Sequence, residues 1–420
     1  MSHCSAEEAV VCEQCDAEEA AGCSCCSAEE PPGKIGLVPL RPAGFRFLGR
    51  ALAKGRGATE ALAVAEEKHE RDALDMAKID VHQHCTIGDE EGLNQLLAAN
   101  AACRVERAVL LALRSLGGSV EDAQRANDWT LAAAARHPTK LVPFVTVVED
   151  DPQAAEVLRE CIRRGARGLK LIGWAGRFIA EHDYDLCSDG MMAVYRVAAE
   201  AGIPVLVHVA LAHDREEQTV ATASSGAVAR DYVADIDAIL SAVPTLRLVL
   251  AHFGLGFDGT SLPRLHGLLE KHATLHIDTS LYGGARDKWL SRASNCATGL
   301  RALVRAFPRQ VLYGTDAFGW RGRAEAAHVA AHRTSCLHLA LHCLRVPELR
   351  RSAYFESARR DAYGPIRFSR VLSGLGLRDE PALIKAVLRE NAARLLAPPC
   401  ATEVGSEVQG SSEPQRAQVR

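Results

Sequence analysis

Histidine, lysine and aspartate residues stand at the ends of several short apolar runs along this chain. They are Asp80, His82, His84, Lys170, His208, His252 and Asp316. Imidazole and carboxylate groups suit Zn²⁺, Fe²⁺ and Mn²⁺, and the absence of Cys among these residues is typical of a catalytic metal site. Their order and setting therefore predict one metal centre that performs chemistry.

We expect four of these side chains to bind a divalent ion: His82, His84, His208 and Asp316. An ion held by imidazoles and a carboxylate lowers the pKa of a bound water and presents hydroxide to an electrophilic carbon. His252 is then the candidate general base or polarising group, because imidazole titrates near pH 7. Asp316 is the second candidate for moving protons. Asp80 is expected to orient a ligating histidine or to cap a turn.

These residues depend on strands that must bring them together. Apolar runs rich in β-branched and aliphatic residues alternate with stretches of helical periodicity. The predicted strands are 77–82, 105–113, 141–148, 166–172, 203–209, 246–252, 274–279 and 310–315. Predicted helices include 120–137, 153–164, 190–201, 231–242 and 262–272, and a helix over 382–396 is expected to close the fold. This alternation predicts an α/β fold, a TIM (β/α)8 barrel whose C-terminal strand ends assemble the chemistry.

Side-chain parity supports a shared site on the first strand. Asp80, His82 and His84 are two residues apart, so an unbroken strand would present all three on one face.

The barrel is expected over residues 77–397, with segments of different character around it. Residues 1–33 form an acidic leader, expected to be disordered because large apolar side chains are scarce there. Residues 34–76 are expected to form a helical extension, and the polar residues 398–420 a disordered tail. The segment 317–380 is much longer than an ordinary connection between a strand and a helix, and its length predicts a helical insertion after the eighth strand.

The insertion contains two histidine pairs, His328 with His332 and His338 with His342, each on one helical face. No acidic residue lies between the members of either pair. We therefore expect a packed or exposed helix face that serves as a wall or lid over the barrel mouth.

The leader contains a cluster of cysteines: Cys4, Cys12, Cys15, Cys23, Cys25 and Cys26. Thiolates could bind an extra soft cation there, or the leader could be a redox-sensitive or passive tail. The other cysteines are scattered and are expected to be core residues without disulfides.

Composition excludes several classes of function. The formal net charge of −4 shows no basic excess for nucleic acid. No apolar run reaches the roughly 18–20 residues of a membrane span, and the first residues lack a secretory signal. We expect a cytoplasmic protein with a small-molecule substrate, and a homodimer is an open alternative.

The sequence resembles the amidohydrolase superfamily, in the group sometimes called amidohydrolase 2, over about residues 78–397. The matching pieces are Asp80-Val81-His82-Gln83-His84, 168–171, 204–208, 250–254, 313–316 and 390–396. The resemblance implies a TIM barrel with the four metal ligands named above and His252 as the catalytic histidine. Members of the family hydrolyse lactones and amide-like bonds, hydrate double bonds, or decarboxylate aromatic and enoic acids.

Lys170 leaves the metal count open. In some branches of the superfamily a carboxylated Lys at this strand end bridges two metals, whereas one metal is usual in the group resembled here. We expect one divalent ion, Zn²⁺ before Mn²⁺ or Fe²⁺, and a second ion only if Lys170 is carboxylated. An unmodified Lys170 could bind a substrate carboxylate.

The substrate pocket is expected to differ from that of familiar members, because the residues after Lys170 and after Asp316 depart from the family pattern. Side chains just beyond the strand ends are Trp174, Arg177, His213, Tyr282, Arg286, Phe318 and Trp320. Some of them should bind substrate, with Trp174, Arg177 and Arg286 as the named candidates.

The leading hypothesis is a metal-dependent hydrolase that attacks a lactone, amide or ester-like bond with a metal-activated water. The first alternative is a non-oxidative decarboxylase of an aromatic or enoic acid that uses the same residues. The second is a metal-storage or metal-sensing protein with a degenerate barrel and a functional leader.

Overall fold

The computed structural model describes part of the chain in detail. The described residues are 75–113, 119–149, 151–171, 185–209, 211, 232–256, 259–281, 293–319, 325–341, 343–344 and 372–397. They all belong to the second of two compact units, Ala63–Arg420. The predicted leader, the tail, and all of the N-terminal extension except Asp75 and Met76 lie outside them.

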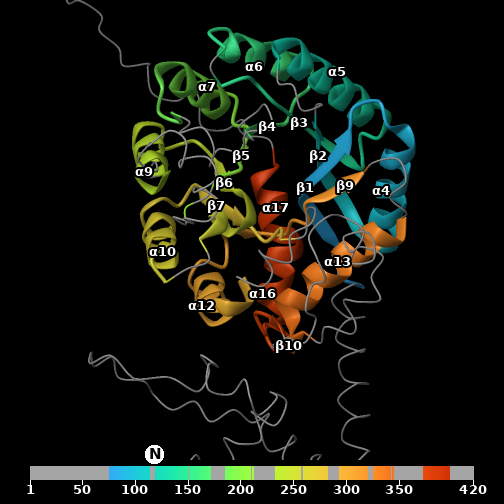
Figure 1. Ribbon diagram of the computed structural model, residues 1–420, viewed down its shortest axis with the longest axis vertical. Helices are drawn as coiled ribbons and strands as arrows, with labels where there is room; N and C mark the ends of the chain where they lie inside the picture. The colour runs from blue at the N-terminus through green and yellow to red at the C-terminus, as the bar shows by residue number, and fades with distance from the viewer. Residues whose placement is uncertain are drawn as a thin grey trace, which may run out of the picture. The chain divides into compact units, whose positions relative to one another are not determined.

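One parallel sheet forms the centre of the described unit (Figure 1). Its strands are β1 (Lys78–Thr86), β2 (Val105–Leu113), β3 (Leu141–Val145), β4 (Gly168–Leu171), β5 (Val205–Val207), β6 (Leu248–Leu250), β7 (Leu275–Asp278), β8 (Val311–Leu312) and β9 (Ala317–Gly319). Neighbours follow chain order from β1 to β8, and β9 pairs with the free edge of β1. Because β8 and β9 belong to one stretch of chain, this stretch joins the two edges and closes the barrel. The predicted fold class is confirmed, with the eighth strand broken in two.

A helix follows each strand except β8, which leads into β9, and these helices cover the outside of the sheet (Figure 1). These helices are α4 (Glu90–Ala102), α5 (Val120–Arg136), α6 (Ala154–Arg163), α7 (Asp189–Glu200), α9 (Tyr232–Ala242), α10 (Ser261–Lys271), α12 (Ala297–Ala306) and α13 (Glu325–Ala340). At the start of α5, Ser119 and Asp122 each accept a hydrogen bond from the other's backbone N–H, a capping box that fixes where the helix begins. The helices within these described residues are each too short or too polar to span a membrane.

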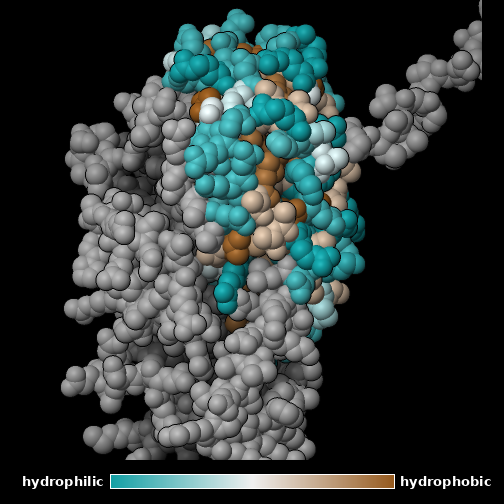
Figure 2. Space-filling view, turned by 90° about the vertical axis from the view of Figure 1, so that its right-hand side faces the viewer, coloured by the Kyte–Doolittle hydropathy of each residue, from teal (hydrophilic) through white to brown (hydrophobic). Residues whose placement is uncertain are grey.

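The outer faces of the helices are polar. On the face turned to the viewer in Figure 2, hydrophilic residues cover most of the described surface, and hydrophobic residues show only in a narrow strip. This distribution is what a ring of amphipathic helices around a buried sheet produces.

The interior of the barrel holds its own apolar cluster, to which strands contribute alternate residues such as Val109 and Leu111 of β2. The predicted closing helix is present as α16 (Pro381–Lys385), a π-helical turn over Ala386–Glu390, and α17 (Asn391–Leu395). Leu395 joins the inner cluster, and Arg247, just before β6, donates a 2.6 Å hydrogen bond to its carbonyl. The C-terminal helix therefore closes the N-terminal end of the barrel and leaves the other end for the site.

Of the two expected roles, wall or lid, the described part of the predicted insertion takes the first, as part of the barrel's outer wall. Its first residues form β9, and α13 then packs on α4 outside the sheet, in the place of the eighth barrel helix (Figure 1). His328, His332 and His338 are buried there. The helix therefore belongs to the outer wall of the barrel, because it packs against α4 and β9, and β9 lies beside β1 in the sheet. A short antiparallel pair follows, β10 (Cys343–Leu344) with β11 (Leu372–Ser373), while His342 lies outside the described residues.

Candidate metal centre

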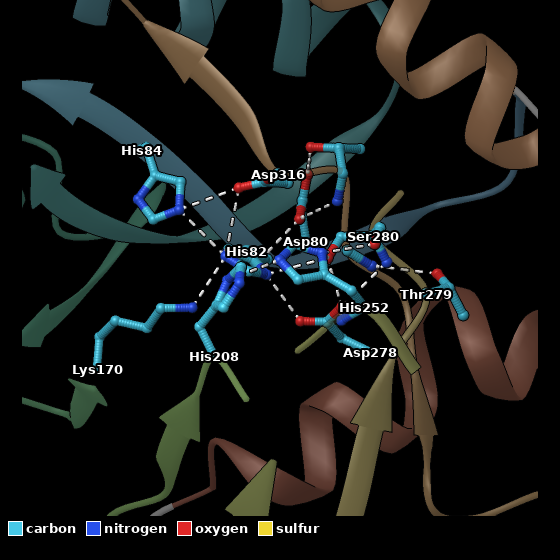
Figure 3. Close-up of polar contacts among 12 residues, drawn as sticks. Asp80, His82, His84, Lys170, His208, His252, Asp278, Thr279, Ser280 and Asp316 are labelled. Carbon is cyan, nitrogen blue, oxygen red and sulfur yellow. Dashed lines mark hydrogen bonds and ion pairs between the residues drawn. The ribbon is translucent and has the colours of Figure 1, made fainter. Parts of the chain in front are cut away.

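Three candidate ligands meet at the C-terminal rim of the barrel (Figure 3). His82 Nε2 lies 3.1 Å from His84 Nε2 and 3.4 Å from Asp316 Oδ1. His84 Nε2 lies 3.1 Å from the same carboxylate oxygen. All three residues are buried. Three potential donor atoms thus converge within the reach of a single ion.

A bulge in β1 allows both histidines to reach this point. Asp80 pairs with Ala108 of β2, and Gln83, three residues later, pairs with Leu110, only two residues further along β2. One strand therefore carries an extra residue, which bends it and breaks the alternation of its side chains. Gln83 faces the outer helices, where its Nε2 donates to Asn100 of α4. The expectation that Asp80 shares one face with the two histidines is wrong, because it assumed an unbroken strand.

Asp316 stands in the bend between β8 and β9. Its φ is 57°, in the left-handed region that non-glycine residues seldom adopt. Its N–H donates a 2.8 Å hydrogen bond to His82 O, so the turn that closes the barrel also aims the carboxylate at the histidines. Burial acts to raise the pKa of Asp316, but attraction to His82 and the hydrogen bond with His84 outweigh it and hold the pKa well below its usual value.

Asp278, the last residue of β7, sets the tautomer of His82. Its Oδ2 accepts a 2.8 Å hydrogen bond from His82 Nδ1, so Nε2 directs its lone pair at the convergence point. Its Oδ1 accepts from the backbone N–H groups of His252 and Ser280. Burial opposes the charge on Asp278, but His82 lowers the pKa of this carboxyl by attraction and by its hydrogen bond.

Asp278 and Ser280 are not among the residues predicted from the sequence. The signal is present there, because the apolar run of β7 ends in Asp278-Thr279-Ser280 in the same way as the runs that end in the predicted site residues. The residue predicted to orient a ligating imidazole is Asp80. Asp80 accepts from the backbone N–H of His82, at 3.0 Å, which agrees with its alternative role as a turn cap.

His252 opens a left-handed turn directly after β6. His252, Phe253, Gly254 and Leu255 all have positive φ, and strain of this kind is common at functional sites. His252 Nδ1 donates to Ser280 O at 2.7 Å, so its Nε2 also carries a lone pair. Burial lowers the pKa of His252 to about 3, which keeps the ring neutral near pH 7 and departs from the titration near pH 7 that its predicted role assumed.

The two remaining candidate imidazoles lie side by side at the rim. His208 follows β5, and its Nδ1 lies 3.1 Å from His252 Nε2. One ligand atom from each of His82, His252 and Asp316 lies within 4.8 Å of the others. The structure therefore brings His252 into one cluster with two expected ligands, His82 and Asp316, and it places His208 next to His252.

The side chain of Lys170, in β4, also reaches the place where the candidate ligand atoms converge. Its Nζ lies 3.1 Å from His82 Nε2, and the side chain is buried. Burial lowers the pKa of Lys170 to about 8, against the attraction of Asp278 and Asp316. Of the predicted pocket residues, Phe318 in β9 has its ring centroid 6.0 Å from that of His84. The others lie outside the described residues: Trp174, Arg177, His213, Tyr282, Arg286 and Trp320.

The chemistry of the donor set fits a divalent ion. Burial lowers the pKa of His84 to about 4, so this ring is neutral near pH 7 and can offer a lone pair beside the ionised Asp316. His84 Nδ1 is buried and finds no hydrogen-bond partner within the described part of the chain. Neutral imidazoles with one carboxylate and no thiolate suit Zn²⁺, Mn²⁺ or Fe²⁺, and three such ligands leave coordination positions open.

Comparisons with known proteins agree with this geometry at the level of family. A family model described as amidohydrolase matches residues 79–397. No curated protein sequence matches the chain.

Several solved structures align with this chain. A probable 2-pyrone-4,6-dicarboxylic acid hydrolase from Acinetobacter baumannii is 13% identical, with a TM-score of 0.47, over 76% of this chain and 99% of that chain. A 2,6-dihydroxybenzoate decarboxylase from Rhizobium is 15% identical, with a TM-score of 0.45, over 76% and 98% of the two chains. A dihydroxybenzoic acid decarboxylase from Polaromonas with bound manganese is 13% identical, with a TM-score of 0.46, over 76% and 97%.

Proposed function

The chain belongs to the amidohydrolase family, and from this premise we propose that it is a metal-dependent hydrolase of a small organic substrate with a lactone, amide or ester-like bond. The observation that carries the proposal is the convergence of His82 Nε2, His84 Nε2 and Asp316 Oδ1 at separations of 3.1–3.4 Å. The family implies a divalent metal, and we propose Zn²⁺, with Mn²⁺ and Fe²⁺ as alternatives.

His82, His84 and Asp316 would hold the ion, and His208 would complete the set. When bound, such an ion supplies a Lewis acid and a water of lowered pKa. His252 remains for proton transfer: its Nδ1 is anchored on Ser280 O, its Nε2 lies 3.1 Å from His208 Nδ1, and the ring belongs to the cluster of His82 and Asp316. A neutral imidazole in this position accepts a proton from an attacking water and returns it to the leaving group.

Lys170 has a separate role in this proposal. Its ammonium group, 3.1 Å from His82 Nε2, is a compact positive charge inside the barrel mouth. Such a charge orients a substrate oxygen, carbonyl or carboxylate, against the convergence point. Asp278 has a supporting role, because its hydrogen bonds hold the ring of His82 and the backbone of His252 in place.

The test combines metal analysis with a substrate screen on the full-length protein, purified without chelator. The leader cysteines are replaced by serine (Cys4, Cys12, Cys15, Cys23, Cys25 and Cys26), so that only the barrel can account for bound metal. We expect about one equivalent of metal per chain and hydrolysis of a member of a lactone, amide and ester panel. An Asp316→Asn variant should lose both.

Other results would redirect or end the proposal. Two equivalents of metal would indicate a carboxylated Lys170 bridge. Release of carbon dioxide from aromatic or enoic acids, without hydrolysis, would replace the hydrolase by the decarboxylase alternative. A folded protein whose barrel takes up no metal, even after incubation with zinc or manganese, would contradict both and would leave the leader as the functional part.

A further inference from the structure

A buried chain of hydrogen bonds connects α13 to the strands that carry the candidate ligands. Its members are Asp80, Gln83, Asn100, Tyr313, Thr315 and His332, and each is at most 5% exposed. They come from β1, α4, the bend after β8, and α13. The roles proposed above use none of these side chains.

Hydrogen bonds lead from Tyr313 through His332, Asn100 and Gln83 to Asp80, and the amides of Asn100 and Gln83 donate to each other. Tyr313 OH lies 2.8 Å from His332 Nδ1, and His332 Nε2 lies 3.0 Å from Asn100 Oδ1. Since the amide oxygen of Asn100 can only accept, His332 carries its proton on Nε2 and accepts from Tyr313 through Nδ1. Asn100 Nδ2 donates to Gln83 Oε1 at 2.9 Å, and Gln83 Nε2 donates to Asp80 Oδ2 at 2.8 Å. The chain therefore ends on a carboxylate.

Asp80 joins the two backbone segments that hold the candidate ligands. Its Oδ1 accepts from the N–H of His82 at 3.0 Å and from the N–H of Thr315 at 3.1 Å. Its Oδ2 accepts from Thr315 Oγ1 at 2.6 Å. Thr315 directly precedes Asp316. One carboxylate thus ties the bulge of β1 to the bend between β8 and β9.

We propose that His332 is a positioning residue for the metal centre: acting through Asn100, Gln83 and Asp80, it sets the spacing between His82 and Asp316. The inference rests on the proposed function, because it supposes that metal binds at these residues. Removal of His332 would take away one of the two donors to Asn100 Oδ1, the other being Gln83 Nε2, and would leave the Asn100 amide freer to turn against Gln83.

The test compares His332→Ala with His338→Ala in the full-length protein with the leader cysteines replaced. Both histidines lie on α13 and are buried alike, at 0% and 1% exposure, so the two variants open similar cavities. Among the described residues, His338 Nε2 has no hydrogen-bond partner, so His338→Ala leaves the chain to Asp80 intact.

Three readouts separate positioning from packing. Zinc affinity is measured by competition with a chelator, ligand geometry by the visible spectrum of the Co²⁺-loaded protein, and local order by hydrogen exchange of the His82 and Thr315 amides in metal-free protein. We expect His332→Ala to weaken zinc binding about tenfold, to shift the Co²⁺ spectrum and to speed both amides. His338→Ala should lower only the resistance to urea. His332→Gln, which restores a donor toward Asn100, should recover part of the affinity.

The outcomes decide between the two proposals. If the parent protein binds zinc and His332→Ala retains its affinity and Co²⁺ spectrum, this inference is wrong and the proposed function stands. An equal loss in His338→Ala would also overturn it, since packing would then explain the effect. If the parent barrel binds no metal, the proposed function fails and this inference fails with it. Should His332→Ala not fold, Tyr313→Phe, which removes only the first donor, is expected to act in the same direction with a smaller loss, and unchanged affinity would refute the inference.

Discussion

His82 Nδ1 donates a 2.8 Å hydrogen bond to Asp278 Oδ2, although 196 residues separate the two in sequence. The sheet order places β8 and β9 between their strands, so the contact crosses the rim of the barrel. It fixes the ring of His82 and leaves Nε2 as the atom that faces His84 and Asp316. A carboxylate that accepts from the distal nitrogen of an imidazole also makes that imidazole a better metal ligand.

Replacing Asp278 by Asn should therefore weaken metal binding. The amide can turn its NH₂ group toward Nδ1 and favour the wrong tautomer, so we expect about a 10–100-fold loss of zinc affinity. Competition with a chelator measures it. The matched control is Asp237→Asn: Asp237 also bonds a histidine, His272, but with an exposed carboxylate at the surface. A loss of equal size in the control would contradict the tautomer argument.

Single replacements of His208 and His252 by Ala should separate ligand from proton carrier. We expect His208→Ala to lose metal, because its imidazole completes the proposed set. His252→Ala should keep the metal and lower kcat by about 10²–10⁴-fold, the range of a general base. Metal content and kcat are measured on the same preparations. Because a ligand atom of His252 lies within 4.8 Å of those of His82 and Asp316, the reverse result would exchange the two roles.

Gly319→Ala should destabilise the fold at the barrel seam. An added Cβ would lie 2.8 Å from the backbone oxygen of Gly92, which α4 holds in place. Overpacking of this kind costs about 1–3 kcal/mol of unfolding free energy. Gly267→Ala is the control, because the exposed Gly267 in α10 has no atom within 4 Å of the added Cβ. There the helix should gain about 0.5–1 kcal/mol. Urea unfolding of both variants measures the difference, and a neutral Gly319→Ala would contradict the tight contact.

Stability should fall as the pH drops below 6.5, in part through His338. Burial lowers the pKa of His338 from 6.5 to about 4. Above pH 6.5 both folded and unfolded chains hold it neutral; below that, only the unfolded chain binds the proton until the pH nears 4. The free energy of unfolding therefore decreases through this window, by on the order of 2 kcal/mol for this residue at pH 5. Urea titrations of wild type and His338→Leu at pH 7, 6 and 5 test it. Parallel pH profiles would show that His338 does not contribute.

Local patterns in the sequence were enough for the elements of the fold. The apolar run of β2 was predicted with its observed bounds, Val105–Leu113, and α5 was predicted to begin at Val120, where the capping box starts it. The apolar run and the capping box each lie within a few neighbouring residues, so both can be recognised without knowledge of the rest of the chain. The identity of the strand-end residues followed from the same runs, and the family resemblance agreed with them.

The arrangement of the site was decided by tertiary structure. The bulge that turns His82 and His84 to one point and Asp80 to the other face depends on how β1 pairs with β2, and one extra residue is enough to reverse the alternation. The partnership of His82 with Asp278 exists only because the barrel closes through the stretch from β8 to β9. Residue types and spacing along the chain determined which chemistry was available, whereas contacts between residues far apart in sequence decided which nitrogen, and which carboxylate, would perform it.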